Sequence, residues 1–461
     1  MNAKNTFDVI IIGAGPAGIF AARELGLVKS HKVLLLEKGR EVEKRKCPAG
    51  IGSEKCLNCK VCSIMSGWGG AGAFSDGKLT LTTHFGGWLN EYLGTDELRD
   101  LIAYVDHIWV ENGAPDQLFG TDEEDFFNLS SRLIRSGLKL LPAQIRHMGT
   151  DNNLRVLTNL RAKIGRNTTI KTNEAVQDIL VENNQVKGVK TSKGTYYAPR
   201  IICAPGREGA QWFTEQAARL NLPLRNNQVD LGLRIEVPAV TMEEITAKIY
   251  EPKIIFNTSH FDDIVRTFCV NPNGHVVMEN TNGIITVNGH SYANSRSNNT
   301  NFALLLSQQF TEPFDQPILY GRYISSLANM LSGGIMIQRY GDLRRGHRTT
   351  PERLAKSVVT PTLAAAVPGD LSLVLPHRYM IGIMECLEAL DREFSGVASD
   401  STLLYGVEAK FYSARPQLTK TLRTSLLGLW TVGDGAGVTR GLIQASVSGV
   451  VAARDILSEK P

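Results

Sequence analysis

The sequence predicts an α/β fold, and three observations carry that prediction. An apolar run, DVIIIG (residues 8–13), leads into a glycine-rich turn and then into a helical pattern that ends near residue 26. A second apolar run, HKVLLLEKG (31–39), follows, so the chain opens with a strand, a helix and a strand. Near the other end, GLWTVGDGAG (428–437) and the helical segment behind it repeat the order of strand, glycine turn and helix.

Length and composition restrict the class of protein. The 461 residues correspond to two or three domains at about 150 residues each. A hydrophobic content of 43% and a charged content of 21% are typical of a soluble globular protein. A net charge of +4 is too small to indicate binding to nucleic acid or to a membrane surface. We expect a cytoplasmic protein without a transmembrane helix, because neither a signal peptide nor a long apolar run is evident.

The middle of the chain contains four stretches of different pattern. Residues 95–164 are predicted to be helical, and 169–206 to form short strands separated by Asn-Asn and Lys-Gly turns. Residues 226–300 are predicted to form a meandering antiparallel sheet from VRTFCV, HVVMEN and IITVNG. Within this stretch, TMEE (241–244) has the pattern of a helix capping box. Residues 301–400 are predicted to mix helices and loops.

A dinucleotide-binding motif lies between the first strand and the first helix. Gly13, Gly15 and Gly18 form G-x-G-x-x-G, and Glu37 ends the second strand 19 residues after Gly18. In this motif the first glycine permits a tight turn, the second lets the backbone approach a pyrophosphate, and the third lets helix and strand pack closely. The helix amino terminus attracts the anion. Glu37 would accept hydrogen bonds from ribose hydroxyls, which favours a cofactor without a 2′-phosphate.

Three segments in a fixed order give the chain a resemblance to a known family. DVIIIGAGPAG near the start, IICAPGR (201–207) in the middle and GLWTVGDGAG near the end resemble the FAD-dependent oxidoreductases of the glutathione-reductase type. The sequence is most similar to a branch of NAD(P)/FAD-dependent oxidoreductases, or FAD-dependent dehydrogenases, which GGAGAFSDGKL (69–79) also resembles. The resemblance implies FAD as cofactor and a discontinuous Rossmann-type FAD-binding domain interrupted by an α+β substrate domain.

The resemblance also implies domain limits and cofactor contacts. The expected divisions are a first FAD-binding segment with the cysteine cluster (1–90), a helical insert (91–150), a second FAD-binding segment (151–215), a substrate or covering domain (216–400) and a third FAD-binding segment (401–461). The helix that begins near Gly441 would direct its amino terminus at the flavin, where it would stabilise negative charge. The expected cofactor-binding residues are Gly13, Gly15, Pro16, Ala17, Gly18, Glu37, Lys38, Gly69, Gly70, Ala71, Val176, Ala204, Gly206, Gly433, Asp434, Gly441, Leu442 and Ile443.

A second complete G-x-G-x-x-G is absent from residues 80–425. Enzymes of the glutathione-reductase type with a stable nicotinamide domain carry such a motif in mid-chain. NAD(P)H is therefore expected only as a transient reductant, or electrons come from another donor. This stretch is better interpreted as a domain that covers the substrate.

Four cysteines lie within sixteen positions, as C-x8-C-x2-C-x2-C: Cys47, Cys56, Cys59 and Cys62. This spacing suits a [4Fe-4S] cluster and also a tetrahedral zinc site. A redox disulfide or unmetallated thiols are the remaining interpretations. An iron–sulfur cluster would exchange single electrons with FAD, whereas zinc would only hold the loop together.

The glycine-rich run GWGGAG (67–72) follows the cysteines directly. In the family that the chain resembles, this segment runs beside the flavin, so Gly69, Gly70 and Ala71 would touch the cofactor; a surface loop is the alternative. Lys78 and Arg440 are the candidate catalytic residues, because either could pair with a substrate carboxylate or an anionic flavin. A surface charge or local salt bridge is the other interpretation of each.

Three functions fit these predictions. The first is an FAD-dependent oxidoreductase, a dehydrogenase or a reductase, that acts on a small organic molecule, for which an acid is one candidate. The second is an electron-transfer flavoprotein in which a cysteine-ligated iron–sulfur cluster exchanges electrons with FAD and a redox partner protein. The third is a flavin-binding protein without turnover. None of them requires nucleic acid or a membrane.

Overall fold

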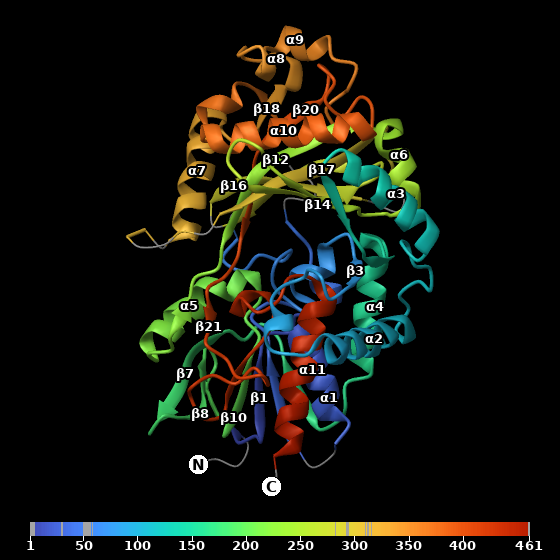
Figure 1. Cartoon of the computed structure of the whole chain (residues 1–461). Coiled ribbons are helices and arrows are strands. Elements are labelled where there is room, and N and C mark those ends of the chain that lie inside the picture. Colours follow the sequence, from blue (N-terminus) through green and yellow to red (C-terminus); the bar gives the residue numbers. More distant parts are fainter. Residues whose placement is uncertain are drawn as a thin grey trace.

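The computed structural model describes residues 5–28, 31–48, 57, 59–281, 283–291, 295–308, 310, 313–314 and 316–459. A parallel sheet and a larger mixed sheet form two layers of the molecule, one above the other in Figure 1. The mixed α/β class predicted from the sequence is confirmed.

The parallel sheet draws its strands from three separate parts of the chain, in the order β22-β10-β1-β2-β6. These strands are β1 (Val9–Ile12), β2 (Val33–Leu36), β6 (Thr168–Lys171), β10 (Arg200–Cys203) and β22 (Leu429–Thr431). The first and last helices, α1 (Pro16–Gly26) and α11 (Leu442–Ser458), lie against each other beside this sheet (Figure 1). They approach closely because a Cβ on Gly449 would lie 2.0 Å from the carbonyl oxygen of Ala17, a position that only glycine can occupy.

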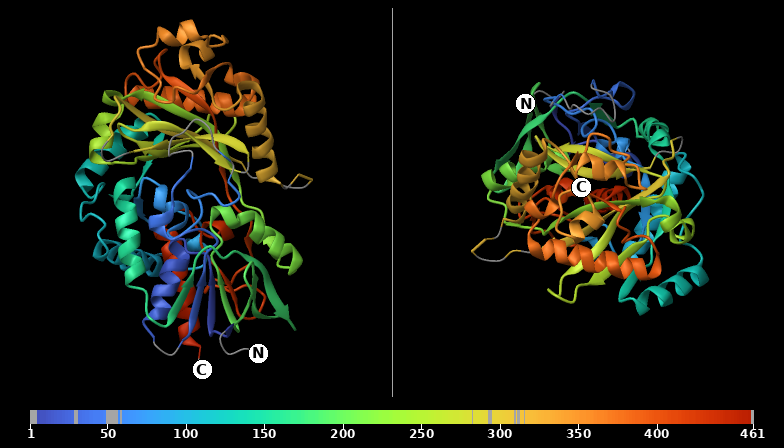
Figure 2. Two further views of the ribbon diagram at one scale, coloured as in Figure 1. Left: turned by 180° about the vertical axis from the view of Figure 1, so that it is seen from behind. Right: turned by 90° about the horizontal axis from the view of Figure 1, so that it is seen from above.

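The larger sheet has eight strands in the order β19-β18-β20-β12-β17-β14-β13-β4. Its strands are β4 (Leu138–Leu141), β12 (Val229–Pro238), β13 (Lys253–Asn257), β14 (Ile264–Asn271), β17 (Asn299–Gln308), β18 (Met336–Arg339), β19 (Val367–Pro368) and β20 (Leu403–Phe411). Helices α6 (Ala239–Lys248), α7 (Pro317–Ser332) and α10 (His377–Glu393) pack on it through an apolar core separate from that of the parallel sheet. Figure 2 shows this lobe from behind and from above.

The remaining elements connect or cover these two sheets. The other helices are α2 (Thr95–Glu111), α3 (Glu123–Arg135), α4 (Thr150–Ala162), α5 (Ala210–Arg219), α8 (Tyr340–Arg344) and α9 (Pro351–Ala355). The small sheets pair β3 (Lys78–Leu81) with β5 (Gln144–His147), β11 (Leu224–Arg225) with β21 (Arg415–Pro416), and β15 (His275–Thr281) with β16 (Ile284–His290), and join β7 (Val176–Glu182), β8 (Gln185–Thr191) and β9 (Thr195–Tyr197).

Three local predictions differ from the structure. Residues 95–164 are not all helical, because β4 and β5 interrupt them; Leu138 and Leu140 are buried on either side of an exposed Lys139, the alternation of a strand. The predicted capping box at 241–244 is wrong, because α6 already begins at Ala239 after Pro238. The meander over 226–300 is also divided: β14 pairs with β13 and β17, whereas β15 and β16 form a separate hairpin.

Candidate functional site: a cavity between the two sheets

A cavity of about 1380 Å³ lies between the glycine turns of the parallel sheet and the eight-stranded lobe. Residues from both ends of the chain line its lower side, and strands β13, β14 and β20 with the β15–β16 hairpin contribute to the other. The structure brings these predicted site residues to its wall: Gly15, Pro16, Ala17, Cys47, Cys62, Gly70, Ala71, Lys78, Ala204, Gly206, Gly433, Asp434, Arg440, Gly441, Leu442 and Ile443.

Bare backbone forms part of this wall. A Cβ at Gly206 or Gly441 would meet no atom within 4 Å, and the nearest neighbour of a Cβ at Gly15 would be 4.0 Å away. At these three glycines, the backbone therefore borders open space that a side chain would occupy. The arrangement fits a ligand that approaches the main chain closely.

Gly13 and Gly18 have a different role, because they pack the turn rather than line the cavity. Gly13 has a φ of +98°, and its Cβ would lie 2.1 Å from the carbonyl oxygen of Ala204. A Cβ at Gly18 would lie 1.9 Å from the carbonyl oxygen of Gly13. Both distances are far below contact, so the motif's first and third glycines hold β1, α1 and β10 together.

Two helices begin at the cavity without a side-chain cap. Gly15 precedes α1, with Pro16 at its first position, and Gly441 precedes α11. The first backbone N–H groups of a helix lack partners within it, so each amino terminus attracts negative charge. Open glycine backbone beside an uncapped helix amino terminus fits the pyrophosphate of a dinucleotide such as FAD.

Asp434 follows the last strand, β22, and its side chain contacts the segment that leads into α11. Its carboxylate accepts a hydrogen bond of 2.8 Å from the hydroxyl of Thr439 and one of 3.3 Å from the backbone N–H of Gly441. Burial raises the pKa of Asp434, although Arg207 and Arg440 act in the opposite direction. A half-buried acceptor at this position fits the hydroxyl groups of a nucleotide cofactor.

Glu37 is held by the backbone around it. Its two carboxylate oxygens accept hydrogen bonds from the backbone N–H groups of Ala14 at 2.8 Å, Gly39 at 2.8 Å and Gly67 at 2.9 Å. The side chain is buried and fixes the glycine-rich run against the dinucleotide turn. Its contact with ribose stays a prediction.

Several predicted cofactor residues lie outside the cavity wall. Lys38 forms an ion pair of 3.5 Å with Glu208. Gly69 donates a hydrogen bond to the carbonyl of Ala14, so it joins the two glycine-rich segments. The residues of the prediction that do not line the cavity are Gly13, Gly18, Glu37, Lys38, Gly69 and Val176.

Four cationic side chains surround the Phe268 ring on the lobe side of the cavity. The distances to the ring centroid are 4.5 Å from Nζ of Lys253, 5.6 Å from Cζ of Arg266, 5.6 Å from Nζ of Lys410 and 5.8 Å from Cζ of Arg440. All five residues line the cavity. We refer to them as the Phe268 cluster. Positive charges gathered on one wall of a cavity favour an anionic ligand.

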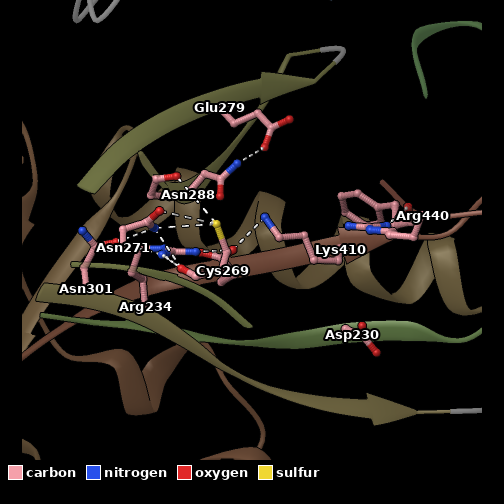
Figure 3. Close-up of polar contacts among 12 residues, drawn as sticks. Asp230, Arg234, Cys269, Asn271, Glu279, Asn288, Asn301, Lys410 and Arg440 are labelled. Atoms are coloured by element: carbon pink, nitrogen blue, oxygen red, sulfur yellow. Dashed lines mark hydrogen bonds and ion pairs between the residues drawn. The ribbon is translucent and has the colours of Figure 1, made fainter. Parts of the chain in front are cut away.

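Two carboxylates compensate part of this charge. Asp230 pairs with Arg266, and Glu408 accepts from Lys410 at 2.7 Å and from the buried Arg234 at 2.8 and 2.9 Å. Figure 3 shows Lys410 and Arg440 on this side, with the ion pair of Lys410 as a dashed line. In the described part of the chain, neither Lys253 nor Arg440 forms an ion pair with a carboxylate. These two cations remain available to a ligand.

A backbone irregularity fixes the position of Phe268. The register of β14 with β17 shifts between Phe268 and Asn271, and Cys269 has a φ of +48°, rare for a residue with a side chain. The carbonyl oxygen of Cys269 accepts from Arg234 at 3.2 Å and from the side chain of Asn271 at 2.8 Å (Figure 3). This buried network supports the strained conformation at the cavity wall.

Lys78 lies at the cavity wall but its ammonium is already bound. It donates to the carbonyl oxygen of Val270 at 2.8 Å and to Oδ1 of Asn271 at 3.1 Å, and it pairs with Asp76 at 3.0 Å and Glu251 at 3.2 Å. Burial alone would lower the pKa of Lys78, but the two carboxylates outweigh it and raise the pKa. These contacts favour a structural role, so its catalytic role stays a prediction without support from the geometry.

The cysteine cluster is described only in part, because Cys56 lies outside the described residues. Cys47 and Cys62 line the cavity, and Cys59 is exposed. All three are free thiols, and the described residues contain no group of three or more His, Cys, Asp or Glu side chains placed to hold a metal. The predicted cluster or zinc site therefore stays a prediction.

Sequence reasoning missed most of the Phe268 cluster. Arg266 and Phe268 lie two residues apart in β14, and residues two apart share one face of an extended strand. Lys410 lies in β20, and Tyr412 follows directly after the strand ends at Phe411. This repeated spacing of a cationic residue and an aromatic ring was the available signal. Lys253 gave no such signal, because it is the first residue of a short apolar strand.

A family model matches the lobe that carries this cluster. Residues 229–411 match the family described as "FAD-dependent protein, C-terminal domain-like". This lobe is therefore similar to a family of FAD-dependent proteins. The matched segment runs from the start of β12 to the end of β20 and contains Phe268, Lys253, Arg266 and Lys410. FAD is thus the cofactor that both the matched family and the glycine-lined wall support.

Comparison with whole proteins gives more distant likenesses. An uncharacterized protein of Clostridium beijerinckii is 26% identical over 478 residues, which cover 98% of this chain and 80% of that protein. A glycine oxidase from Geobacillus kaustophilus is 14% identical with a TM-score of 0.40, covering 99% of this chain and 96% of that one. An L-proline dehydrogenase from P. horikoshii is 13% identical with a TM-score of 0.41, covering 98% and 93%. At these scores the structural likenesses do not extend to function.

Within the described residues, no helix combines the length and the apolar character needed to span a bilayer.

Proposed function

We propose that the protein is an FAD-dependent oxidoreductase that oxidises or reduces a small organic acid in the cavity between the two sheets. One observation carries the proposal: the cavity has bare glycine backbone on one side and the Phe268 cluster on the other. The first side fits a dinucleotide, and the second fits the carboxylate of a substrate.

Different residues of the chain would bind the cofactor and the substrate. Gly15, Gly206, Gly441 and Asp434 would hold FAD, and bound FAD supplies the capacity to accept or donate a hydride or single electrons. Arg440 would bind the substrate anion, because its guanidinium faces the Tyr412 ring at 4.4 Å and has no carboxylate partner in the described chain.

The direct test is anaerobic reduction of the FAD-loaded chain by candidate substrates. Hydroxy and amino acids are added one at a time, each beside its neutral amide, and loss of the flavin absorption is recorded. Bleaching by an acid and not by its amide is expected. Absence of FAD binding, or equal bleaching by acid and amide, would overturn the proposal. NAD(P)H is tested in the same way, as the transient reductant that the absence of a second dinucleotide motif predicts.

An electron-transfer role is the second candidate, and one observation favours it. Cys47 and Cys62 line the same cavity as Gly70 and Leu442, so the cysteine loop adjoins the proposed flavin site. In this role a metal cluster or dithiol would exchange electrons with FAD and with a redox partner protein. Iron, sulfide and zinc analysis of chain purified without oxygen tests it. Iron and sulfide in equal amounts support an iron–sulfur cluster, and absence of metal from freshly purified chain contradicts one.

A further inference from the structure

Lys253 differs from the other cations of the Phe268 cluster because nothing polar in the described chain binds its side chain. It is the first residue of β13 and is only 4% exposed, yet it lines the cavity. Its ammonium lies 4.5 Å from the centroid of the Phe268 ring and 5.2 Å from that of Phe85. Among the residues that the structure describes, it has neither a hydrogen-bond acceptor nor an ion-pair partner. A buried ammonium without a partner is costly, so the neutral amine is favoured.

The carboxylates near Lys253 form ion pairs with other cations. Glu251, two residues before Lys253, pairs with Lys78 at 3.2 Å. Asp230 on β12 pairs with Arg266 and accepts from the hydroxyls of Tyr412 and Ser307, each at 2.5 Å. Neither acid forms an ion pair with Lys253. The charge state of this side chain therefore depends on the cavity and on what binds there.

The surrounding charges act on this amine from three elements. Burial lowers the pKa of Lys253 most, and Arg266 on β14 lowers it further. Glu251 beside β13, Asp230 on β12 and the Cys269 thiol on β14 act in the opposite direction but only partly offset the first two. The resulting pKa is about 7. Lys410 and Arg440 also lie over the Phe268 ring, and their positive charges further disfavour the charged form of Lys253.

We propose that Lys253 is the acid–base residue of the cavity and takes the proton from the O–H or N–H group of a bound organic acid as that acid is oxidised. This inference rests on the proposed function. It assigns binding of the acid's carboxylate to Arg440 and proton transfer to Lys253, two cations without carboxylate partners in the described chain. Lys78 and Lys410 are not suited to the role, because carboxylates hold their ammonium groups.

Proton transfer to Lys253 and oxidation of the substrate involve adjacent atoms of the bound acid. The O–H or N–H bond of the substrate breaks, and the lone pair of Nζ forms an N–H bond, which converts the amine to an ammonium. The electron pair left on the heteroatom forms the new C=O or C=N bond. The adjacent C–H bond breaks, and its hydrogen leaves with two electrons for the oxidised flavin of the proposed function. The ammonium then returns its proton to solvent, and in the reductive direction it supplies that proton to the substrate.

The first test measures the amine itself and does not depend on turnover. The full-length chain, purified with FAD, is treated with formaldehyde and a mild borane reductant over a range of pH, and methylation of each lysine is followed by mass spectrometry. Half-maximal reactivity of Lys253 near pH 7 is expected from its pKa of about 7. Lys248, an exposed lysine of α6 that pairs with Asp125, is the matched control and should react only in alkali. Reactivity of Lys253 only in alkali, or no reaction at any pH, would overturn the proposal.

The second test uses the variants Lys253→Met and Lys253→Arg, with Lys248→Met as control. Flavin reduction by an active acid should slow about 100-fold or more in both Lys253 variants, and the rise in rate between acidic and neutral pH should disappear. In Lys253→Met, FAD content, melting temperature and affinity for an unreactive carboxylate should stay close to wild type, because methionine fits the apolar surroundings. Retention of wild-type rate and pH profile, or loss of FAD from both variants, would contradict an acid–base role.

The two proposals fail in different ways. If no acid reduces the flavin of the wild-type chain, the proposed function fails, and with it the role of Lys253 in oxidation. If acids do reduce the flavin but Lys253 titrates like Lys248, only the assignment of Lys253 fails.

Discussion

The backbone N–H of Gly441 donates a hydrogen bond of 3.3 Å to the carboxylate of Asp434, and this bond ties the end of the last strand to the start of the last helix. The same carboxylate accepts from Thr439 at 2.8 Å. Replacing Asp434 by alanine removes both bonds and should reduce FAD affinity about tenfold or more, because the amino terminus of α11 loses its position at the cavity. Titration of the FAD-free chain with FAD measures this change. An unchanged affinity would contradict the placement of the cofactor.

The glycines of the dinucleotide turn should respond differently to the same substitution. Gly15 has a φ of −76°, and a Cβ there meets nothing nearer than 4.0 Å. Gly15→Ala should therefore leave the melting temperature of the FAD-free chain nearly unchanged and weaken FAD binding about tenfold. Gly18→Ala is the matched control: its Cβ would lie 1.9 Å from the carbonyl oxygen of Gly13. That variant should lose stability in addition, and equal behaviour of the two variants would contradict the division of roles.

Arg440 should determine the preference for anions. In the described chain, Arg440 forms no ion pair with a carboxylate. The variant Arg440→Ala should therefore change the affinity for ligands more than the stability of the fold. A charge-assisted hydrogen bond contributes about 1.5–3 kcal/mol, so the Kd of a carboxylate inhibitor should rise about 10- to 100-fold. Arg344→Ala is the control, because this exposed arginine pairs with Asp400 on the far side of the lobe. Equal inhibitor affinity in the two variants would contradict a role in anion binding.

The buried pair of Asp76 and Lys78 should stabilise the fold in a pH-dependent way. Burial alone would raise the pKa of Asp76, but Lys78 and other neighbouring cations outweigh burial and lower it below 3.8. A lowered pKa stabilises the folded state at all pH values above 3.8, and this contribution is lost as the pH falls through the folded value.

The change Asp76→Asn should therefore reduce the free energy of unfolding by about 3–5 kcal/mol near neutral pH. The deficit should shrink in strong acid, where the wild-type carboxyl is protonated too. Denaturant titration at both conditions provides the measurement. Asp96→Asn, which breaks an exposed pair with Arg99, should cost less than about 1 kcal/mol and serves as control. A deficit that is the same at neutral and acidic pH would contradict the ion pair.

The sequence predicted the parallel sheet well because its signals are local. Apolar runs and glycine turns identify β1, β2 and β22, and each signal lies within about ten residues. β4 escaped prediction because an alternation of four residues, Leu138 to Leu141, is too short to stand out among helical patterns. Its partner, β13, lies more than 100 residues further along the chain.

The sequence predicted residues of the glycine-lined wall of the cavity but not the Phe268 cluster on the opposite wall. Gly15, Gly206 and Gly441 carry motif signals, whereas Phe268 and the cations around it come from β13, β14, β20 and the turn before α11. Only tertiary structure brings these segments together. Lys78 illustrates the same dependence on tertiary structure: it follows the glycine-rich run in sequence and lines the cavity. Glu251 and Val270, which bind its ammonium, are remote in sequence and could not be foreseen.

The central claim is that this chain holds FAD against the glycine-lined wall of its cavity. The most direct measurement is the visible absorption spectrum of the freshly purified chain, followed by quantification of the FAD released when it is denatured. We predict a flavin spectrum and one FAD per chain. A colourless chain that takes up no FAD when the cofactor is supplied in excess would contradict the claim.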